Sequence, residues 1–316
     1  MMSFINALPG AVSQGLIWGI MAIGVYITYK ILDIADLTVD GSICTGGAVF
    51  VVLFTGGVNL WLAMLAAVLA GMLAGLITGL LHTFCGIPAI LAGILTQLGL
   101  YSVNMAVMGM KATVAINVTD PEQLDRLLVS LRFVQDVAKG NRPFWRHPIF
   151  VVGLFTVVLI AVLYWFFGTE LGSALRATGS NQNMARAQGI STNFAKVLGL
   201  MISNGMVALS GALLAQYSSA SEINMGRGAI VIGLAAVIIG EVIFGKLFRN
   251  FGLKLLAVSI GAIIYYIVLQ AVLAMGLNPN YLKLLSALVV AVFLSIPYWK
   301  NRYFSKPLKK GGNVNA

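Results

Sequence analysis

Nine stretches of mostly apolar residues dominate this sequence, and each is close to the length of about 20 residues that spans a lipid bilayer. Only 9% of the residues are charged and the mean hydropathy is +0.93, whereas soluble domains carry about 25% charged residues. The sequence therefore predicts an all-α, polytopic transmembrane bundle with about nine spans, in a range of about eight to ten. The stretches cover roughly residues 12–31, 38–54, 59–81, 87–108, 149–167, 195–217, 229–245, 253–275 and 281–298.

Residues 12–108 and 195–298 share an order of features that predicts an inverted repeat. Each begins with a glycine-spaced helix, GLIWGIMAIG or GLMISNGMVALSG, followed by a polar break and a short glycine-rich apolar run. Units offset by five spans run in opposite directions, which is a recurring transporter architecture. Gly71, Gly75 and Gly79 lie four residues apart, and we expect the face that they share to pack against protein.

The formal net charge of +10 is concentrated beyond the last apolar run, and this location argues against nucleic acid binding. A basic segment after a span is typical of a cytoplasmic tail, here 299–316. Alternation then places 168–196 inside, and the N-terminus, 109–148 and 218–228 outside. The basic residues of the tail are Lys300, Arg302, Lys306, Lys309 and Lys310.

Two of the loops predict short helices. In 168–196, Ser180 is a candidate N-cap, 181–188 contains good helix formers, and Gly189 is a candidate C-cap. In 109–148, Asp120 as N-cap and Pro121 at the first helical position predict an amphipathic helix whose leucines extend to Leu131. This outer helix either receives a protein partner or covers the mouth of the bundle.

Polar side chains within or beside the spans are the candidates for a translocation pathway, because such groups are costly in lipid. Asp40 is either a cap for the helix that starts at Gly41 or a ligand contact. Glu241, the only acid inside a clear apolar run, is either a helix-end acid near water and Arg249 or a group for gating or partner contact. The pathway candidates are Asp40, Ser42, Thr45, Gln97, Asn104, Ser203 and Asn204.

The sequence contains no P-loop motif, and its two histidines, His82 and His147, have no metal-ligand spacing. We therefore expect no catalytic residue, no metal site and no cofactor in this chain. A membrane-embedded enzyme would need a polar catalytic cluster, and none is visible.

Four motifs in order resemble the permease subunits of bacterial ABC importers for branched-chain amino acids and ribose-type sugars. LTVDGSICTGGAVF is similar to the family signature LT-[VI]-[DE]-GS-x-x-x-GA, and GIPAILAGILTQLG is similar to its proline-containing fourth segment. ALRATGSNQNMARAQGIST resembles the cytoplasmic motif RA-x-G-x-N-x-x-x-A-x-x-x-GI. GRGAIVIGLAAVIIGE resembles a late glycine-rich run, except that Glu241 stands where many members have glycine.

The resemblance implies a type II ABC importer-like fold in the bacterial inner membrane, working as a homodimer. It also implies two cytoplasmic ATPase chains that hold ATP and Mg²⁺, and an external solute-binding protein. The solute would be an amino acid, branched-chain or aromatic; a simple sugar or nucleoside importer and an ion-coupled secondary transporter remain alternatives. The implied ATPase-coupling residues are Arg176, Ala177, Gly179, Asn181, Met184, Ala185, Arg186 and Gly189.

Overall fold

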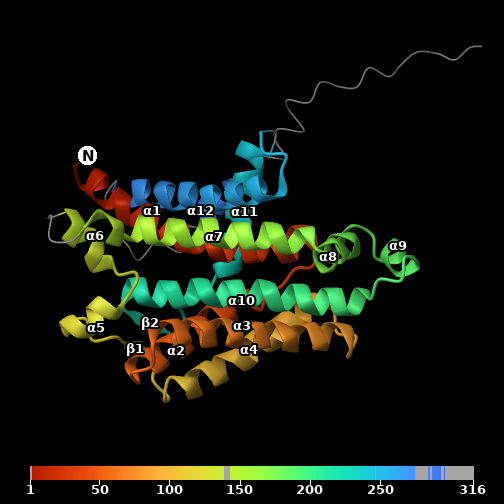
Figure 1. Ribbon diagram of the computed structural model, residues 1–316, viewed down its shortest axis with the longest axis horizontal. Helices are drawn as coiled ribbons and strands as arrows, with labels where there is room; N and C mark the ends of the chain where they lie inside the picture. The colour runs from red at the N-terminus through yellow and green to blue at the C-terminus, as the bar shows by residue number, and fades with distance from the viewer. Residues whose placement is uncertain are drawn as a thin grey trace, which may run out of the picture.

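The computed structural model describes residues 2–138, 143–245, 247–274, 284, 287–292 and 295. The elements within these ranges form an elongated bundle of helices that lie side by side (Figure 1). In chain order they are α1 (Met2–Tyr26), the π-helix η1 (Ile27–Ile31), α2 (Val39–Thr55), α3 (Leu60–Thr83), α4 (Ala89–Val107), β1 (Thr113–Ala115), α5 (Pro121–Arg126), α6 (Leu131–Ala138), the 3₁₀ turn η2 (Phe144–Arg146), α7 (Pro148–Gly168), α8 (Glu170–Ser180), α9 (Gln182–Ala187), α10 (Thr192–Ser218), β2 (Ala220–Glu222), α11 (Ala229–Phe244) and α12 (Phe251–Ala274).

The predicted all-α transmembrane bundle is confirmed, with two helices shorter than a full span. Six described helices are long and apolar enough to cross a membrane, whereas α2 and α11 have only 17 and 16 residues. At about 1.5 Å per residue such helices reach roughly 25 Å, less than the hydrocarbon core of about 30 Å. The predicted ninth span, 281–298, lies mostly outside the described residues.

Glycines set the closest helix contacts, as expected for packing without a hydrophobic drive from lipid. A Cβ at Gly75 of α3 would overlap the backbone of Leu200 in α10, and Gly71 and Gly79 meet the same helix. The prediction that this glycine face contacts protein is therefore confirmed. On the other side of the bundle, Gly15 of α1 packs against the backbone of α12 in the same way. The pairs α3–α10 and α1–α12 thus have similar packing, and the inverted repeat of 12–108 and 195–298 stays a prediction.

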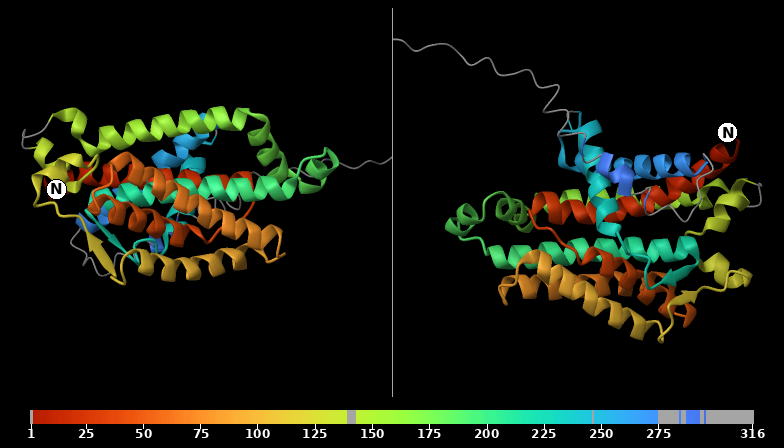
Figure 2. Two further views of the ribbon diagram at one scale, coloured as in Figure 1. Left: turned by 60° about the horizontal axis from the view of Figure 1, so that its bottom comes forward. Right: turned by 180° about the vertical axis from the view of Figure 1, so that it is seen from behind.

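The two ends of the bundle carry different structures. Helices α8 and α9 lie at one end, and α5, α6 and the strands lie at the other (Figures 1 and 2). The strands, which the sequence did not predict, pair antiparallel with Thr113 opposite Glu222 and Ala115 opposite Ala220. They join the loops 109–148 and 218–228, which the sequence placed together on the outer side.

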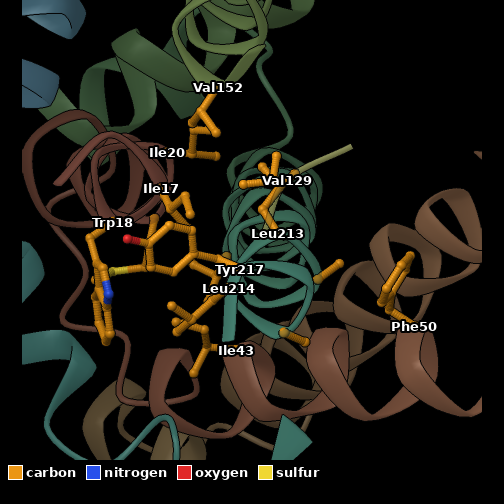
Figure 3. Close-up of a cluster of buried hydrophobic side chains, with 14 of the residues drawn as sticks. Ile17, Trp18, Ile20, Ile43, Phe50, Val129, Val152, Leu213, Leu214 and Tyr217 are labelled. Atoms are coloured by element: carbon orange, nitrogen blue, oxygen red, sulfur yellow. The ribbon is translucent and has the colours of Figure 1, made fainter. Parts of the chain in front are cut away.

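The outer loop contributes to the core of the bundle. Val129 is fully buried and lies over α10 near Leu213, while Ile17 of α1 and Ile43 of α2 approach from the other sides (Figure 3). The loop therefore closes the end of the apolar core opposite α8 and α9 (Figure 1).

The predicted outer helix is correct at its start and wrong in its extent. Asp120 caps α5 by accepting a hydrogen bond from the N–H of Glu122 at 3.0 Å, and Pro121 is the first helical residue. The helix ends at Arg126, because the Leu127 side chain is buried in the core and the N–H of Leu128 donates to Oε1 of Gln216 on α10 at 3.3 Å. A second helix, α6, begins only at Leu131.

Candidate coupling and translocation sites

The loop 168–196 forms two helices that project from one end of the bundle (Figures 1 and 2). Helix α8 is a separate element, capped at its start by Thr169, and it does not continue α7. Ser180 is the last residue of α8, so its assignment as the N-cap of the next helix is wrong. Asn181 takes that role, because its extended backbone lets Oδ1 accept from the N–H of Met184 at 3.0 Å.

Helix α9 ends as predicted and presents an exposed tip. Gly189 follows the C-cap with φ +79°, a conformation that favours glycine. The Met184 side chain is 62% exposed, whereas Ala185 is buried. Nε of Arg186 donates to Oγ1 of Thr192 at 2.9 Å, which fixes the tip to the start of α10.

Helix α8 links this tip to the first span. Gly179 packs against the carbonyl of Ile31 so closely that any Cβ would overlap it. Nη2 of Arg176 donates to the carbonyl of Phe167 at 2.7 Å. Ala177, which follows Arg176 in α8, is half-buried. The eight predicted coupling residues therefore lie together at one end of the molecule. Their contact with an ATPase stays a prediction.

Two of the predicted pathway residues meet in a buried polar cluster. Oγ of Ser42 donates to Oδ1 of Asn204 at 2.6 Å, and Nδ2 of Asn204 donates to Oδ2 of Asp36 at 2.7 Å. Asp36 is only 2% exposed, and it also accepts from the N–H of Thr38 at 2.9 Å. The cluster fastens the loop before α2 to the middle of α10, as buried polar groups require such partners.

Three other pathway candidates line a cavity of about 270 Å³ between α2, α4 and the segment before α11. They are Asp40, Gln97 and Asn104, and Tyr101 and Arg227 complete its polar lining. Among the described residues, nothing donates a hydrogen bond to the buried Oδ1 of Asn104, and the Arg227 guanidinium has no ion pair. The cavity thus offers one unpaired cation, whereas the unpartnered Oδ1 of Asn104 is buried in its wall.

Asp40 caps a helix, but not the helix that the sequence suggested. It lies in the first turn of α2, and its two carboxylate oxygens accept from the N–H groups of Gly228 and Ile230 at 3.0 and 2.9 Å. These donors are at the N-terminus of α11, where a negative charge is stabilised. Asp40 therefore joins the two short apolar helices and also borders the cavity.

The remaining pathway candidates donate hydrogen bonds to backbone carbonyls and do not line this cavity. Oγ1 of Thr45 donates to the carbonyl of Gly41 within α2 at 3.0 Å. Oγ of Ser203 donates to the carbonyl of Gly24 at 2.8 Å, which links α10 to α1. These contacts give both side chains a packing role.

Glu241 forms an ion pair with Lys30, with 3.1 Å between Nζ and Oε1. The expected contact with Arg249 is not made among the described residues. Lys30 lies at the end of the first span and Glu241 late in α11, so the pair joins two segments far apart in the sequence. Its role in gating or partner contact stays a prediction.

Asp36, Tyr101 and Arg227 are polar site residues that sequence reasoning missed. Asp36 stands directly before the LT motif, in a break where several acids made any one of them unremarkable. Arg227 lies outside every apolar run, so the pattern of the spans does not single it out. The signal available in the sequence was the position of Arg227 directly before Gly228, at the start of an apolar run. In the structure Gly228 has φ +87° and α11 begins after it.

Comparisons with known proteins agree with one another. Residues 8–294 match the family described as "Branched-chain amino acid transport system / permease component". A "Tyrosine transport system permease protein" of Clostridioides difficile is 36% identical over 290 residues, covering 92% of this chain and 91% of that protein. A fructose import permease protein of Bifidobacterium longum is 24% identical, covering 89% and 74%. The solved structure of PsaBC from Streptococcus pneumoniae in complex with Fab has a TM-score of 0.54 at 18% identity, covering 96% of this chain and 99% of that one, and shows likeness of fold alone.

Proposed function

We propose a function for this chain, which belongs to the branched-chain amino acid transport system permease family. As a member it is a multi-pass permease of the bacterial inner membrane and a transport subunit, not an enzyme. We propose further that it forms the translocation pathway of an ATP-driven importer for an amino acid, branched-chain or aromatic. An external binding protein would deliver this solute.

The cavity lined by Asp40, Gln97, Asn104, Tyr101 and Arg227 is the observation that carries the choice of solute. The unpaired guanidinium of Arg227 suits a carboxylate. The oxygen of Gln97 suits an ammonium group, and the exposed ring of Tyr101 suits an apolar or aromatic side chain. At about 270 Å³ the cavity is near the small end of ligand sites, which run from about 300 Å³ upwards.

Coupling to ATP would run through α9, α8 and η1. In this proposal α9 sits in a groove of an ATPase chain, which holds ATP and Mg²⁺, and a second copy of the permease does the same on a second ATPase chain. Movement of α9 reaches the first span because Gly179 of α8 packs directly on Ile31. Closure of the ATPase pair then tilts the packed spans between outward-open and inward-open arrangements.

A simple sugar is the competing solute, because the Bifidobacterium relative is a fructose import permease and amide side chains also bind hydroxyl groups. The charge of Arg227 separates the two possibilities. A neutral sugar gains little from an unpaired guanidinium, whereas an amino acid would lose its carboxylate partner if that guanidinium were removed.

The test is ATP-dependent uptake by proteoliposomes that contain this permease with its co-purified ATPase and binding protein. Tyrosine, leucine, ribose and fructose are compared for the parent chain, Arg227→Gln and the outer-loop control Lys111→Gln. We expect uptake of an amino acid that falls about tenfold or more in Arg227→Gln, the size of one charged hydrogen bond, and is unchanged in Lys111→Gln.

Three outcomes would contradict parts of the proposal. Sugar uptake unaffected by Arg227→Gln would favour the sugar importer. Amino acid uptake unaffected by that substitution would remove the cavity from the pathway. Uptake driven by an ion gradient without ATP would make the chain a secondary transporter.

A further inference from the structure

A second cavity, of about 600 Å³, lies at the end of the bundle that carries α8 and α9. Elements distant in the sequence surround it: the end of α1 with η1, helix α8, and the start of α12 with the residues before it. Four basic side chains line it, and no acidic side chain is among the lining residues. They are Lys30, Arg176, Arg249 and Lys254.

Most of this positive charge is not neutralised by the protein. Lys30 pairs with Glu241 at 3.1 Å. Within the described part of the chain, Arg176 donates only to the neutral carbonyl of Phe167. Among the described residues, the exposed side chains of Arg249 and Lys254 have neither an ion pair nor a hydrogen bond.

The rest of the chain offers few carboxylates for this cavity. Residues 139–142, 246 and 275–316 contain no aspartate or glutamate. Asp33 is exposed close in sequence to Ile31 but does not line the cavity. Glu170 lines a separate cavity between α8 and α10. The chain therefore supplies too few anions to balance the charge of this cavity, and a balancing anion has to come from another molecule.

The residues around the cavity indicate that it lies at the depth of lipid headgroups. Lys30 is the residue before the end of the span Ala7–Ile31, and Lys254 is in the first turn of α12. Tyr164, which packs against Gly252, and its neighbour Trp165 are 57% and 72% exposed. Exposed aromatic rings of this kind gather where a membrane meets water.

We propose that this cavity binds a phosphate group, supplied by the headgroup of an anionic phospholipid in the cytoplasmic leaflet. Lysine and arginine side chains form strong charge-assisted hydrogen bonds to phosphate oxygens. Basic pockets between helices on the cytoplasmic side of membrane proteins bind anionic headgroups in the same way. Because the phosphate would contact α1, α8 and α12 together, it would brace the helices at this end of the bundle.

Native mass spectrometry of the full chain in detergent tests the proposal. Palmitoyl-oleoyl phosphatidylglycerol and the zwitterionic phosphatidylcholine with the same chains are added separately, with and without millimolar sodium phosphate. The variants Arg249→Gln and Lys254→Gln each remove one cavity charge, and Lys111→Gln removes one charge at the opposite end. Thermal unfolding of each variant checks that the fold is retained.

We expect phosphatidylglycerol to be retained in preference to phosphatidylcholine, and each cavity variant to weaken its binding about tenfold, or about 1.4 kcal/mol. Lys111→Gln should bind as the parent chain does. Displacement of the lipid by sodium phosphate would support the phosphate site but assign it to a soluble anion. Equal phosphatidylglycerol retention by the parent chain and both cavity variants would overturn the proposal. Weaker association of the variants with an ATPase, without any change in lipid binding, would overturn it in favour of an acidic group on that partner.

Discussion

At the scale of single residues, Asn204 holds a buried position in which its side chain bonds two other buried polar side chains. It receives a hydrogen bond from Ser42 and donates to Asp36, and all three side chains are buried. In Asn204→Leu, the Asp36 carboxylate loses a donor, and leaving a buried polar group without its partner costs about 1–3 kcal/mol. We expect a lower midpoint of thermal unfolding for the detergent-purified variant.

Ser42→Ala is the matched variant, because it removes one neutral hydrogen bond and leaves the contact between Asn204 and Asp36. Its cost should be only about 0.5–1.5 kcal/mol. If the two variants unfold at the same temperature, the contact with Asp36 does not stabilise the protein.

The pair of Lys30 and Glu241 should contribute little to stability, although it joins distant segments. The two side chains are 49% and 39% exposed, and exposed ion pairs are worth about 0–1 kcal/mol because water screens them. A double-mutant cycle with Lys30→Gln and Glu241→Gln should give a coupling free energy below about 1 kcal/mol. A much larger value would mean that the pair is shielded from water in the assembled membrane protein.

At the scale of elements, the end of α9 depends on the backbone of Gly189. A β-branched residue is strained at φ +79°, whereas asparagine tolerates the left-handed region better. Gly189→Val should therefore insert normally but transport poorly, with ATP hydrolysis by the partner continuing, since the helix that contacts the ATPase would be misplaced. Gly189→Asn should transport at close to the parent rate. Uptake and ATP hydrolysis are measured on the same proteoliposomes, and normal uptake by Gly189→Val would contradict the coupling role of α9.

The contact between α3 and α10 depends on the absence of a side chain at Gly75. A methyl group there would overlap the backbone of Leu200, so Gly75→Ala requires the two helices to separate. Gly153→Ala on α7 is the control, because nothing lies within 4 Å of the added Cβ. We expect a lower thermal midpoint for Gly75→Ala, by an amount equivalent to about 1–3 kcal/mol, and a slight change for Gly153→Ala. Equal midpoints would mean that the helices separate at no cost.

At the scale of the whole molecule, the sequence predicted the elements that depend on local pattern. Long apolar runs have to form helices in a membrane, because every backbone polar group must be satisfied within the segment. The glycine face of α3 and the Asp120 cap were also predicted correctly, because each depends on residues within a few positions of one another. Contacts between distant segments were not readable. The capping of α11 by Asp40, the extended chain at Leu127 and the pairing of β1 with β2 each depend on a partner far away in the sequence.

The candidate sites also divide into one that a local pattern predicts and one that depends on contacts between distant segments. The coupling residues lie in one continuous loop, so their motif placed them together. The translocation cavity combines α2, α4 and the residues before α11, and the sequence supplied Asp40, Gln97 and Asn104 without showing that Arg227 faces the same space. Where a site is assembled from several segments, composition and spacing identify candidates but not neighbours.

The orientation of the whole chain in the membrane is the prediction on which both proposals depend. Residues of α9 and α5 lie at opposite ends of the bundle (Figure 1), and the basic residues of the tail predict that α9 faces the cytoplasm. Asn183→Cys and Glu122→Cys put a thiol on exposed positions of α9 and α5, in a background where Cys44 and the exposed Cys85 are replaced by serine. In intact spheroplasts, a membrane-impermeant maleimide should label Glu122→Cys at once, and Asn183→Cys only after permeabilisation. The reverse pattern would move α9 away from any cytoplasmic ATPase and the basic cavity to the outer leaflet, and both proposals would fail together.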